Sequence, residues 1–253
     1  TPNEENKNKT PAMNKTPNEE NKNKTPAMNK TPNEENKINI LSSDAMSKLK
    51  IIKQIGQGAS STVFKVEGDK IYALKVLNNA LIKQDSESDD DDAELEIDIK
   101  KVSRFLCEYE VMNSLKHPNI IKAYGFFFGD TKNAPSILLE YCNHSLESYI
   151  KKMNNSERSD AIIDFCNVMK FVHKAGIIHR DLKPSNILID ENNKIKLSDF
   201  GICGLISNEY ETITRTKMMG SMLFMAPELL QGSSDYDEKV DVYAFGVVLY
   251  FIL

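Results

Sequence analysis

The sequence has few cysteines, and none of them are closely paired. Only four occur in 253 residues, at positions 107, 142, 166 and 203, with no Cys-x-x-Cys pair and no histidine cluster of the kind that binds zinc. This spacing argues against a zinc site and favours reduced thiols. We therefore expect a cytoplasmic protein, and a nuclear location also fits.

Long apolar runs are also missing. The N-terminus is rich in Asn, Lys and Thr, which argues against a signal peptide. The longest apolar stretch, at 247–253, is too short to span a bilayer. No basic stripe is interleaved with aromatic residues, so nothing favours nucleic-acid binding. We expect a soluble protein with no membrane span and no nucleic-acid partner.

The acidic charge is confined to one segment. The chain carries 32 basic and 37 acidic residues, a net charge of −5. Positions 85–98 hold nine acidic residues and no basic ones, so the remainder has a charge of +4. We interpret 84–98 as an acidic insertion or exposed loop, and the overall charge therefore says little about partners.

The first 37 residues consist of a short repeat. Residues 1–15, TPNEENKNKTPAMNK, recur unchanged at 16–30, and a third copy begins at Thr31 and breaks off after Lys37. Copies with so few apolar residues have nothing to bury by stacking, so we predict that 1–44 is disordered. The alternative is a docking or regulatory tail, because each of five threonines precedes a proline: Thr1, Thr10, Thr16, Thr25 and Thr31.

From residue 45 the apolar pattern predicts a folded domain that reaches residue 253. Apolar alternation from Leu49 predicts a strand near 49–55, and short apolar segments predict further strands near 63–66, 71–76, 120–128 and 136–140. Helical spacing predicts helices at 99–115, 145–152 and 160–174, the last closed by Gly176. The order indicates a small β-rich lobe at about 45–140 and a helical lobe at about 144–253.

One stretch carries most of the chemistry. His179-Arg180-Asp181-Leu182-Lys183-Pro184-Ser185-Asn186 is followed thirteen residues later by Asp199-Phe200-Gly201. It combines two carboxylates, a lysine and an amide that can bind a metal. Such groups suit phosphoryl transfer from ATP to a hydroxyl, which depends on positioning, metal ligands and cationic donors.

Two features upstream fit a phosphate-binding site. Gly56-Gln57-Gly58-Ala59-Ser60-Ser61 resembles a glycine-rich phosphate loop, although an ordinary hairpin turn is the alternative because Ser61 replaces the third glycine. Lys75 on a later strand would place a cation on the phosphates. That lysine needs a carboxylate to orient it, and we favour Glu108 over Glu110 from its spacing to His117-Pro118.

These motifs together resemble the eukaryotic protein kinase family over about residues 50–253. The same order holds Ala226-Pro227-Glu228, then Asp241 with Phe245-Gly246. The resemblance implies an α+β, bilobal protein-kinase-like fold, with an antiparallel N-lobe sheet plus one main helix and a mostly helical C-lobe. It also implies that a complete domain continues beyond Leu253, so the C-lobe here would be incomplete.

The resemblance also implies roles for single residues. Asp181 would accept the proton of the substrate hydroxyl, Lys183 would stabilise the transferred phosphate, and Lys75 paired with Glu108 would anchor ATP. Asn186 and Asp199 would hold Mg²⁺. The nucleotide site would further include Ile55, Gly56, Gly58, Ser61, Val63, Ala73, Leu139 as gatekeeper, Glu140, Cys142 and Leu188.

Two positions indicate which type of residue would accept the phosphate. Serine/threonine kinases, rather than tyrosine kinases, are resembled at both positions: Lys183, two residues after the base, and Gly220-Ser221. The sequence around and after Ala226 is most similar to the tyrosine-kinase-like branch of these kinases. Arg180 predicts control by an upstream kinase through phosphorylation. The candidate sites are Thr212, Thr214 and Thr216, and we favour Thr216.

We expect an ATP-dependent protein serine/threonine kinase that acts on protein substrates. The alternative is a truncated or non-catalytic kinase-like scaffold that works as a binding module, which only the end of the chain at Leu253 supports.

Overall fold

The computed structural model describes residues 38–78, 81–83, 95–201, 222–233 and 235–253. The repeats at 1–37 and the centre of the acidic segment lie outside these ranges, as do Cys203, Thr212, Thr214, Thr216 and Ser221. All described residues belong to one compact unit that runs to the end of the chain.

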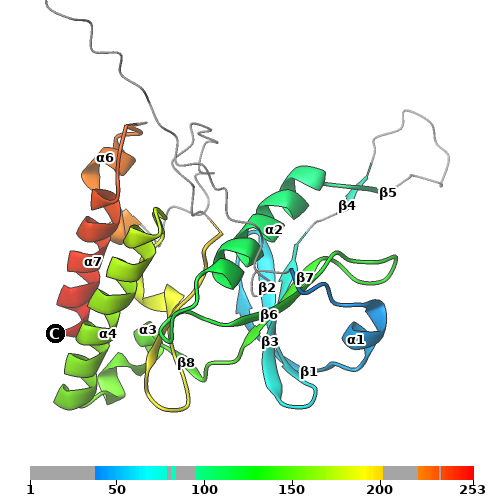
Figure 1. Cartoon of the computed structure of the whole chain (residues 1–253), viewed down its shortest axis with the longest axis horizontal. Coiled ribbons are helices and arrows are strands. Elements are labelled where there is room, and N and C mark those ends of the chain that lie inside the picture. Colours follow the sequence, from blue (N-terminus) through cyan, green and yellow to red (C-terminus); the bar gives the residue numbers. More distant parts are fainter. Residues whose placement is uncertain (1–37, 79–80, 84–94, 202–221, 234) are drawn as a thin grey trace, which may run out of the picture. The chain divides into compact units, whose positions relative to one another are not determined.

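The first half of this unit is an antiparallel sheet of five strands. These are β1 (Lys50–Gln57), β2 (Ser61–Glu67), β3 (Ile71–Leu77), β6 (Ala123–Phe127) and β7 (Ser136–Glu140), in the order β1-β2-β3-β7-β6 (Figure 1). Short turns join β1 to β2 and β2 to β3, so these strands pair as hairpins. The strands expected from the apolar pattern are confirmed.

The main helix of this half is α2 (Ile99–Ser114), which packs against β6. Its buried apolar residues are Phe105, Tyr109 and Met112, spaced three and four apart as on one face of a helix. The side chain of Asp98 caps the helix by accepting from the backbone N–H of Lys101 at 3.1 Å. The predicted helix is confirmed.

The acidic segment is framed by a short two-stranded ribbon. Strand β4 (Leu81–Lys83) pairs antiparallel with β5 (Leu95–Ile97), and Asp98 then caps α2. Residues 95–98, which we expected to belong to the insertion, therefore form a strand and a helix cap. Apolar residues at 95 and 97 alternate with acidic ones, which is the pattern of a strand.

Packing begins before residue 45, where the folded domain was expected to start. Helix α1 (Ser43–Ser47) follows residues 39–41, which add to the sheet beside β6 through a parallel bridge between Ile40 and Phe126. We call residues 38–49 the N-terminal strap.

The second half is mostly helical. It contains β8 (His144–Ser145), α3 (Leu146–Tyr149), a 3₁₀ turn η2 (Ile150–Lys152), α4 (Asn155–Lys174), η3 (Pro184–Asn186), β9 (Ile187–Ile189), β10 (Ile195–Leu197), η5 (Met222–Phe224), α6 (Pro227–Leu230) and α7 (Lys239–Ile252). Helix α4 begins five residues before the expected start at residue 160, because Asn154 and Glu157 form a capping box. It ends as expected at Lys174, and Gly176, whose φ is +75°, follows its last turn.

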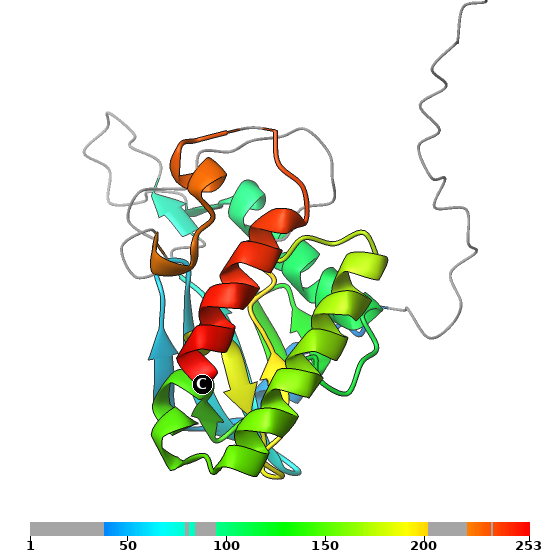
Figure 2. The same ribbon diagram turned by 90° about the vertical axis from the view of Figure 1, so that its left-hand side faces the viewer.

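Helices α4 and α7 lie side by side, and the rings of Phe165 and Phe245 are 4.7 Å apart (Figure 2). One core cluster joins both halves, with Tyr109 and Ile137 from the first and Phe165 and Leu197 from the second. The expected bilobal α+β fold is confirmed. Within the described residues, no helix is both long and apolar enough to cross a bilayer.

Candidate active site

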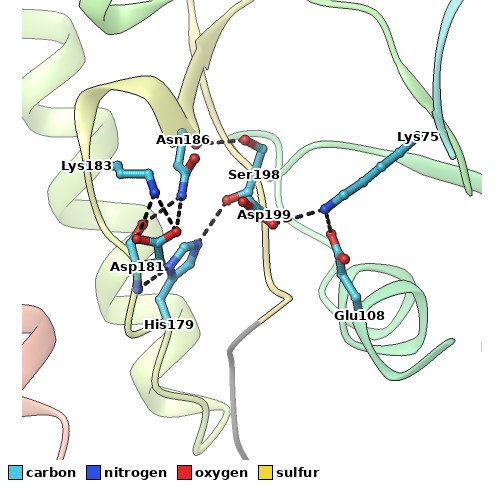
Figure 3. A network of polar contacts seen from close by, with 8 residues as sticks. All are labelled: Lys75, Glu108, His179, Asp181, Lys183, Asn186, Ser198 and Asp199. Atoms are coloured by element: carbon cyan, nitrogen blue, oxygen red, sulfur yellow. Dashed lines mark hydrogen bonds and ion pairs between the residues drawn. The ribbon is translucent and has the colours of Figure 1, made fainter. Parts of the chain in front are cut away.

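Lys75 lies between two carboxylates, one from each half of the unit. Its Nζ is 2.5 Å from Glu108 Oε1 on α2 and 3.0 Å from Asp199 Oδ1 after β10 (Figure 3). Lys75 and Glu108 are almost inaccessible, with side-chain exposures of 11% and 5%, whereas Asp199 is 42% exposed. The two ion pairs therefore connect a buried carboxylate on α2 with a partly exposed carboxylate after β10.

The charge of Lys75 is secured by these neighbours. Burial by itself would lower the pKa of the Lys75 ammonium, but the negative charges of Glu108 and Asp199 and their hydrogen bonds outweigh it and raise that pKa above its usual value. Lys75 is thus a fixed cation at any physiological pH. A cation in this place can bind phosphate oxygens.

The two candidate glutamates of α2 lie in different surroundings. Glu108 is 4% exposed and contacts Lys75, whereas Glu110 is exposed. Residues two apart on a helix point about 200° apart, so only one of them can face β3. The structure brings the favoured glutamate to the lysine.

A second polar cluster surrounds Asp181. Lys183 Nζ donates to both carboxylate oxygens of Asp181, at 2.9 and 2.7 Å. Asn186 Nδ2 donates to the backbone carbonyl and to Oδ2 of the same aspartate, at 2.8 and 3.0 Å (Figure 3). The side chain of Asp181 is therefore held in one orientation by an ammonium and an amide, both from the loop that follows it.

The start of this loop is held by Asp241 of α7. The Asp241 carboxylate, 1% exposed, accepts from the backbone N–H groups of His179 at 2.7 Å and Arg180 at 2.8 Å, and His173 Nε2 lies 2.9 Å away. Arg180 has a φ of +66°, a strained backbone conformation for any residue other than glycine. The hydrogen bonds to Asp241 stabilise that conformation, which sets the direction of the chain just before Asp181.

His179 connects Asp181 with the segment that carries Asp199. Its Nε2 lies 3.0 Å from the carbonyl oxygen of Ser198, and its Nδ1 accepts from the backbone N–H of Asp181 at 3.3 Å. A carbonyl can only accept, so the proton of the neutral ring is on Nε2. His179 is fully buried against the ring of Phe200, 4.8 Å away.

The sequence reasoning gave no role to His179, Asp241, Ser198 or His173. The first two stand in the quoted motifs, and a buried polar residue inside such a motif is a signal for a supporting role. No local pattern marks Ser198 or His173, because their partners are distant in sequence.

Arg180 has a guanidinium nitrogen that forms no hydrogen bond with any residue the structure describes. Its Nε is buried and finds no partner within the described residues, while its Cζ lies 5.2 Å from the centre of the Tyr236 ring. A buried cationic donor of this kind suits an anion. The threonines proposed to carry that anion, Thr212, Thr214 and Thr216, lie outside the described residues, as does Ser221.

The glycine-rich segment forms the turn between β1 and β2. Gly58 N–H donates to the carbonyl of Ser61 at 2.8 Å, and Asn78 Nδ2 donates to the carbonyl of Gly58 at 3.1 Å. A Cβ atom at Gly58 would lie 3.5 Å from the carbonyl oxygen of Ser61, an ordinary contact. The turn is thus a closed hairpin. Ile55 is 41% exposed in β1.

The residues expected around an adenine ring gather in one apolar cluster. Ala73 and Leu139 face each other across β3 and β7 and are buried, and the partly buried residues packed with them include Val63, Cys142 and Leu188. Burial, and then the charge of Glu140, raise the pKa of the Cys142 thiol to about 12. Glu140 Oε1 itself is 3.0 Å from Lys196 Nζ of β10.

A divalent cation would have few protein ligands here. Within the described ranges, no group of three or more His, Cys, Asp or Glu side chains could hold a metal ion. Asn186 and Asp199 offer one amide and one carboxylate oxygen, and Mg²⁺ is bound in many sites by one or two such oxygens plus substrate phosphates. The two residues fit that mode.

Comparisons with known proteins agree with this geometry. Residues 49–253 match the model of the protein kinase domain. The chain is 33% identical to a protein named "Probable serine/threonine-protein kinase PknB" of Lactococcus lactis over 81% of this chain and 31% of that protein. It is 32% identical to an Aurora kinase of Saccharomyces cerevisiae over 83% of this chain and 53% of the relative.

A third relative, "Serine/threonine-protein kinase KIC1" of Saccharomyces cerevisiae, is 31% identical over 82% of this chain and 18% of its own length. The chain belongs to the protein kinase family. It spans 31%, 21% and 19% of the length of the first three curated relatives that it matches.

Proposed function

We propose that this protein is an ATP-dependent protein serine/threonine kinase that transfers the γ-phosphate to hydroxyl groups of protein substrates. The observation that carries the proposal is the link from Glu108 through Lys75 to Asp199. It joins the helix of the first half to the segment of the second half from which a metal ligand would come. Phosphoryl transfer requires that the cation that binds the phosphates and the residue that binds the metal lie close together.

Asp181 is the proposed base. Its carboxylate accepts the proton of the attacking hydroxyl, while Asn186 fixes its orientation. Lys183 Nζ, 2.7 Å from Asp181 Oδ2, is close enough to interact with a phosphate that approaches the same carboxylate. Positioning and charge stabilisation are the main contributions that a protein makes to this reaction.

ATP is the proposed phosphate donor, with its adenine among Val63, Ala73, Leu139 and Leu188 and its phosphates at Lys75. Mg²⁺ would neutralise phosphate charge when it is bound by Asn186 and Asp199. The backbone of Glu140 and Cys142 is proposed to hydrogen-bond the edge of the base. The ion pair between the Glu140 side chain and Lys196 supports a role for the backbone alone, because that side chain already has a partner.

Serine and threonine are the proposed acceptors. Lys183 beside the base supports this specificity, and so do the relatives named serine/threonine-protein kinases. We further propose that an upstream kinase controls the protein by phosphorylating Thr216. The buried Nε of Arg180 supports that proposal, because a phosphate would give it a charged acceptor.

The experiment is transfer of radiolabelled γ-phosphate from ATP to a generic Ser/Thr-rich protein. It is run with the 253-residue chain and with a C-terminally longer version, each beside its Asp181→Asn variant. We expect transfer in at least one version and a loss of about 10³-fold or more in its Asp181→Asn variant. Absence of transfer in both versions would overturn the enzymatic proposal in favour of a binding module.

A further inference from the structure

The N-terminal strap fills the outer edge of the sheet. Strand β6 ends the order β1-β2-β3-β7-β6, so one side of it has no neighbouring strand of the sheet. The strap occupies that side: Phe126 N–H donates to Asn39 O at 2.8 Å, and Leu41 N–H donates to Phe126 O at 2.8 Å. An open edge exposes unpaired backbone groups, and the strap satisfies them.

The strap also contacts both faces of the sheet. Ile38 packs against the core that contains α2, whereas Leu41, Met46 and Leu49 pack against the cluster on the other face. Ser43 Oγ donates to Asp130 Oδ2 at 2.8 Å in the loop after β6. Figure 1 shows α1, the helical part of the strap, beside the sheet. The strap therefore packs around the edge of the sheet formed by β6.

Gly125 makes this close approach feasible. A Cβ atom at residue 125 would lie 2.7 Å from Leu41 Cγ and 3.1 Å from the carbonyl oxygen of Asn39. Both distances are shorter than ordinary contacts, and the second involves backbone. Any larger residue would push the strap off the edge of β6.

One hydrogen bond connects the strap to α2. The backbone N–H of Asn39 donates to the hydroxyl of Tyr109 at 3.1 Å, and Tyr109 is fully buried. Tyr109 directly follows Glu108, so the two side chains leave the helix about 100° apart. Glu108 is held by Lys75 and Tyr109 by the strap. Two anchors in different directions fix the rotation of a helix about its axis, which one anchor alone does not.

We propose that the strap and Tyr109 are positioning elements for the reaction, because they hold α2 in the rotation that brings Glu108 to Lys75. Tyr109 acts through Glu108 and touches no reacting group. The role in catalysis rests on the proposed function, whereas the effect on α2 does not. The segment before the kinase domain thereby influences the arrangement of the active site.

The first test is hydrogen exchange of the α2 backbone amides. Tyr109→Phe removes the acceptor for Asn39 N–H and keeps the ring, so we expect these amides to exchange about fivefold faster, the effect of one lost hydrogen bond. Tyr124→Phe is the matched control: its hydroxyl bonds Lys70 at 2.9 Å and not α2. Equal exchange of α2 in wild type and Tyr109→Phe would overturn the proposal.

The second test separates positioning from general stability. The dissociation constant of MgATP is measured for Tyr109→Phe in the wild-type and Glu108→Gln backgrounds. We expect Tyr109→Phe to weaken binding about fivefold in the first and to have no effect in the second, because its action passes through Glu108. Equal weakening in both backgrounds would show a merely structural role and overturn the proposal.

Gly125→Val provides an independent route. It should expel the strap without substituting any residue of α2, and so reproduce the faster exchange of α2 amides seen in Tyr109→Phe, with no further increase in the double variant. If Gly125→Val does not fold, Tyr109→Phe alone decides. A chain that binds no MgATP would contradict the proposed function, and hydrogen exchange would still decide the role of the strap.

Discussion

The buried carboxylate of Asp241 accepts the backbone N–H of His179 at 2.7 Å, although the two residues are 62 positions apart. The same carboxylate accepts the N–H of Arg180 and contacts His173. A side chain of α7 thus holds the backbone of the loop that presents Asp181. The stability of the fold and the geometry of the site depend on the same carboxylate.

Asp241→Asn should lower both stability and activity. The amide offers one acceptor oxygen in place of two and turns an N–H group toward other donors, so a buried backbone donor loses its partner. We expect the free energy of unfolding to fall by about 1–3 kcal/mol, as measured by urea denaturation. Glu238→Gln, an exposed change at the start of the same helix, is the control and should stay within about 0.5 kcal/mol of wild type. A smaller loss for Asp241→Asn than for the control would contradict the assignment.

Glu108→Gln should impair transfer far more than Glu110→Gln. The first change removes the charge that orients Lys75, whereas the second alters an exposed side chain on the same helix. We expect kcat/KM to fall about 10²-fold for Glu108→Gln, as for a misplaced catalytic group, and to change less than about twofold for Glu110→Gln. Steady-state kinetics with varied ATP measures both. Similar values for the two variants would show that the ion pair has no catalytic importance.

Cys142 should resist alkylation. Burial, followed by the charge of Glu140, raises its pKa to about 12, so at pH 8.5 fewer than about one molecule in a thousand carries the reactive thiolate. Peptide mass spectrometry after iodoacetamide should find Cys166, which is exposed, modified long before Cys142. Cys142 reacting as fast as Cys166 would contradict the burial.

The same raised pKa has a consequence for stability. An unfolded cysteine ionises near pH 8.5, whereas folded Cys142 does not ionise until about pH 12. The unfolded state therefore loses a proton first, and stability falls as pH rises from about 8.5 toward 12. Cys142→Ala should flatten this part of the profile in thermal denaturation, and an unchanged slope would contradict the assignment.

Thr216→Ala should reduce transfer by the phosphorylated protein to the rate of the phosphatase-treated wild type. The reason is the buried Nε of Arg180, which has no hydrogen-bond partner among the residues that the structure describes and would gain one from a phosphate. The comparison is made beside Thr212→Ala and Thr214→Ala, which should retain most of the activity. Full activity of Thr216→Ala would assign the control elsewhere.

Much of the fold could be predicted because its signals are local. Short apolar segments mark β2, β3 and β7, and three- and four-residue spacing marks α2. The start of α4 was missed because the capping box at Asn154 precedes the first apolar residue. The strap was missed because it is held by hydrogen bonds to Tyr109 and Phe126, which are distant in sequence.

The residues of the candidate site also fall into two groups, those that local motifs reveal and those that only the fold brings together. Lys75, Asp181, Asn186 and Asp199 stand in ordered motifs and could be named from the sequence. The supporting contacts could not, since Asp241, His173 and Ser198 meet the loop around Asp181 only after folding. Short motifs identify the groups proposed to react, whereas the residues that position these groups are identified only from the packing of the folded chain.

The most direct test of the central claim is the identity of the residue that receives phosphate. After transfer of radiolabelled γ-phosphate to a protein that contains serine, threonine and tyrosine, the product is hydrolysed and its phosphoamino acids are separated. We predict phosphoserine and phosphothreonine from the wild-type protein and neither from Asp181→Asn. Label in phosphotyrosine alone, or equal label from wild type and Asp181→Asn, would contradict the account.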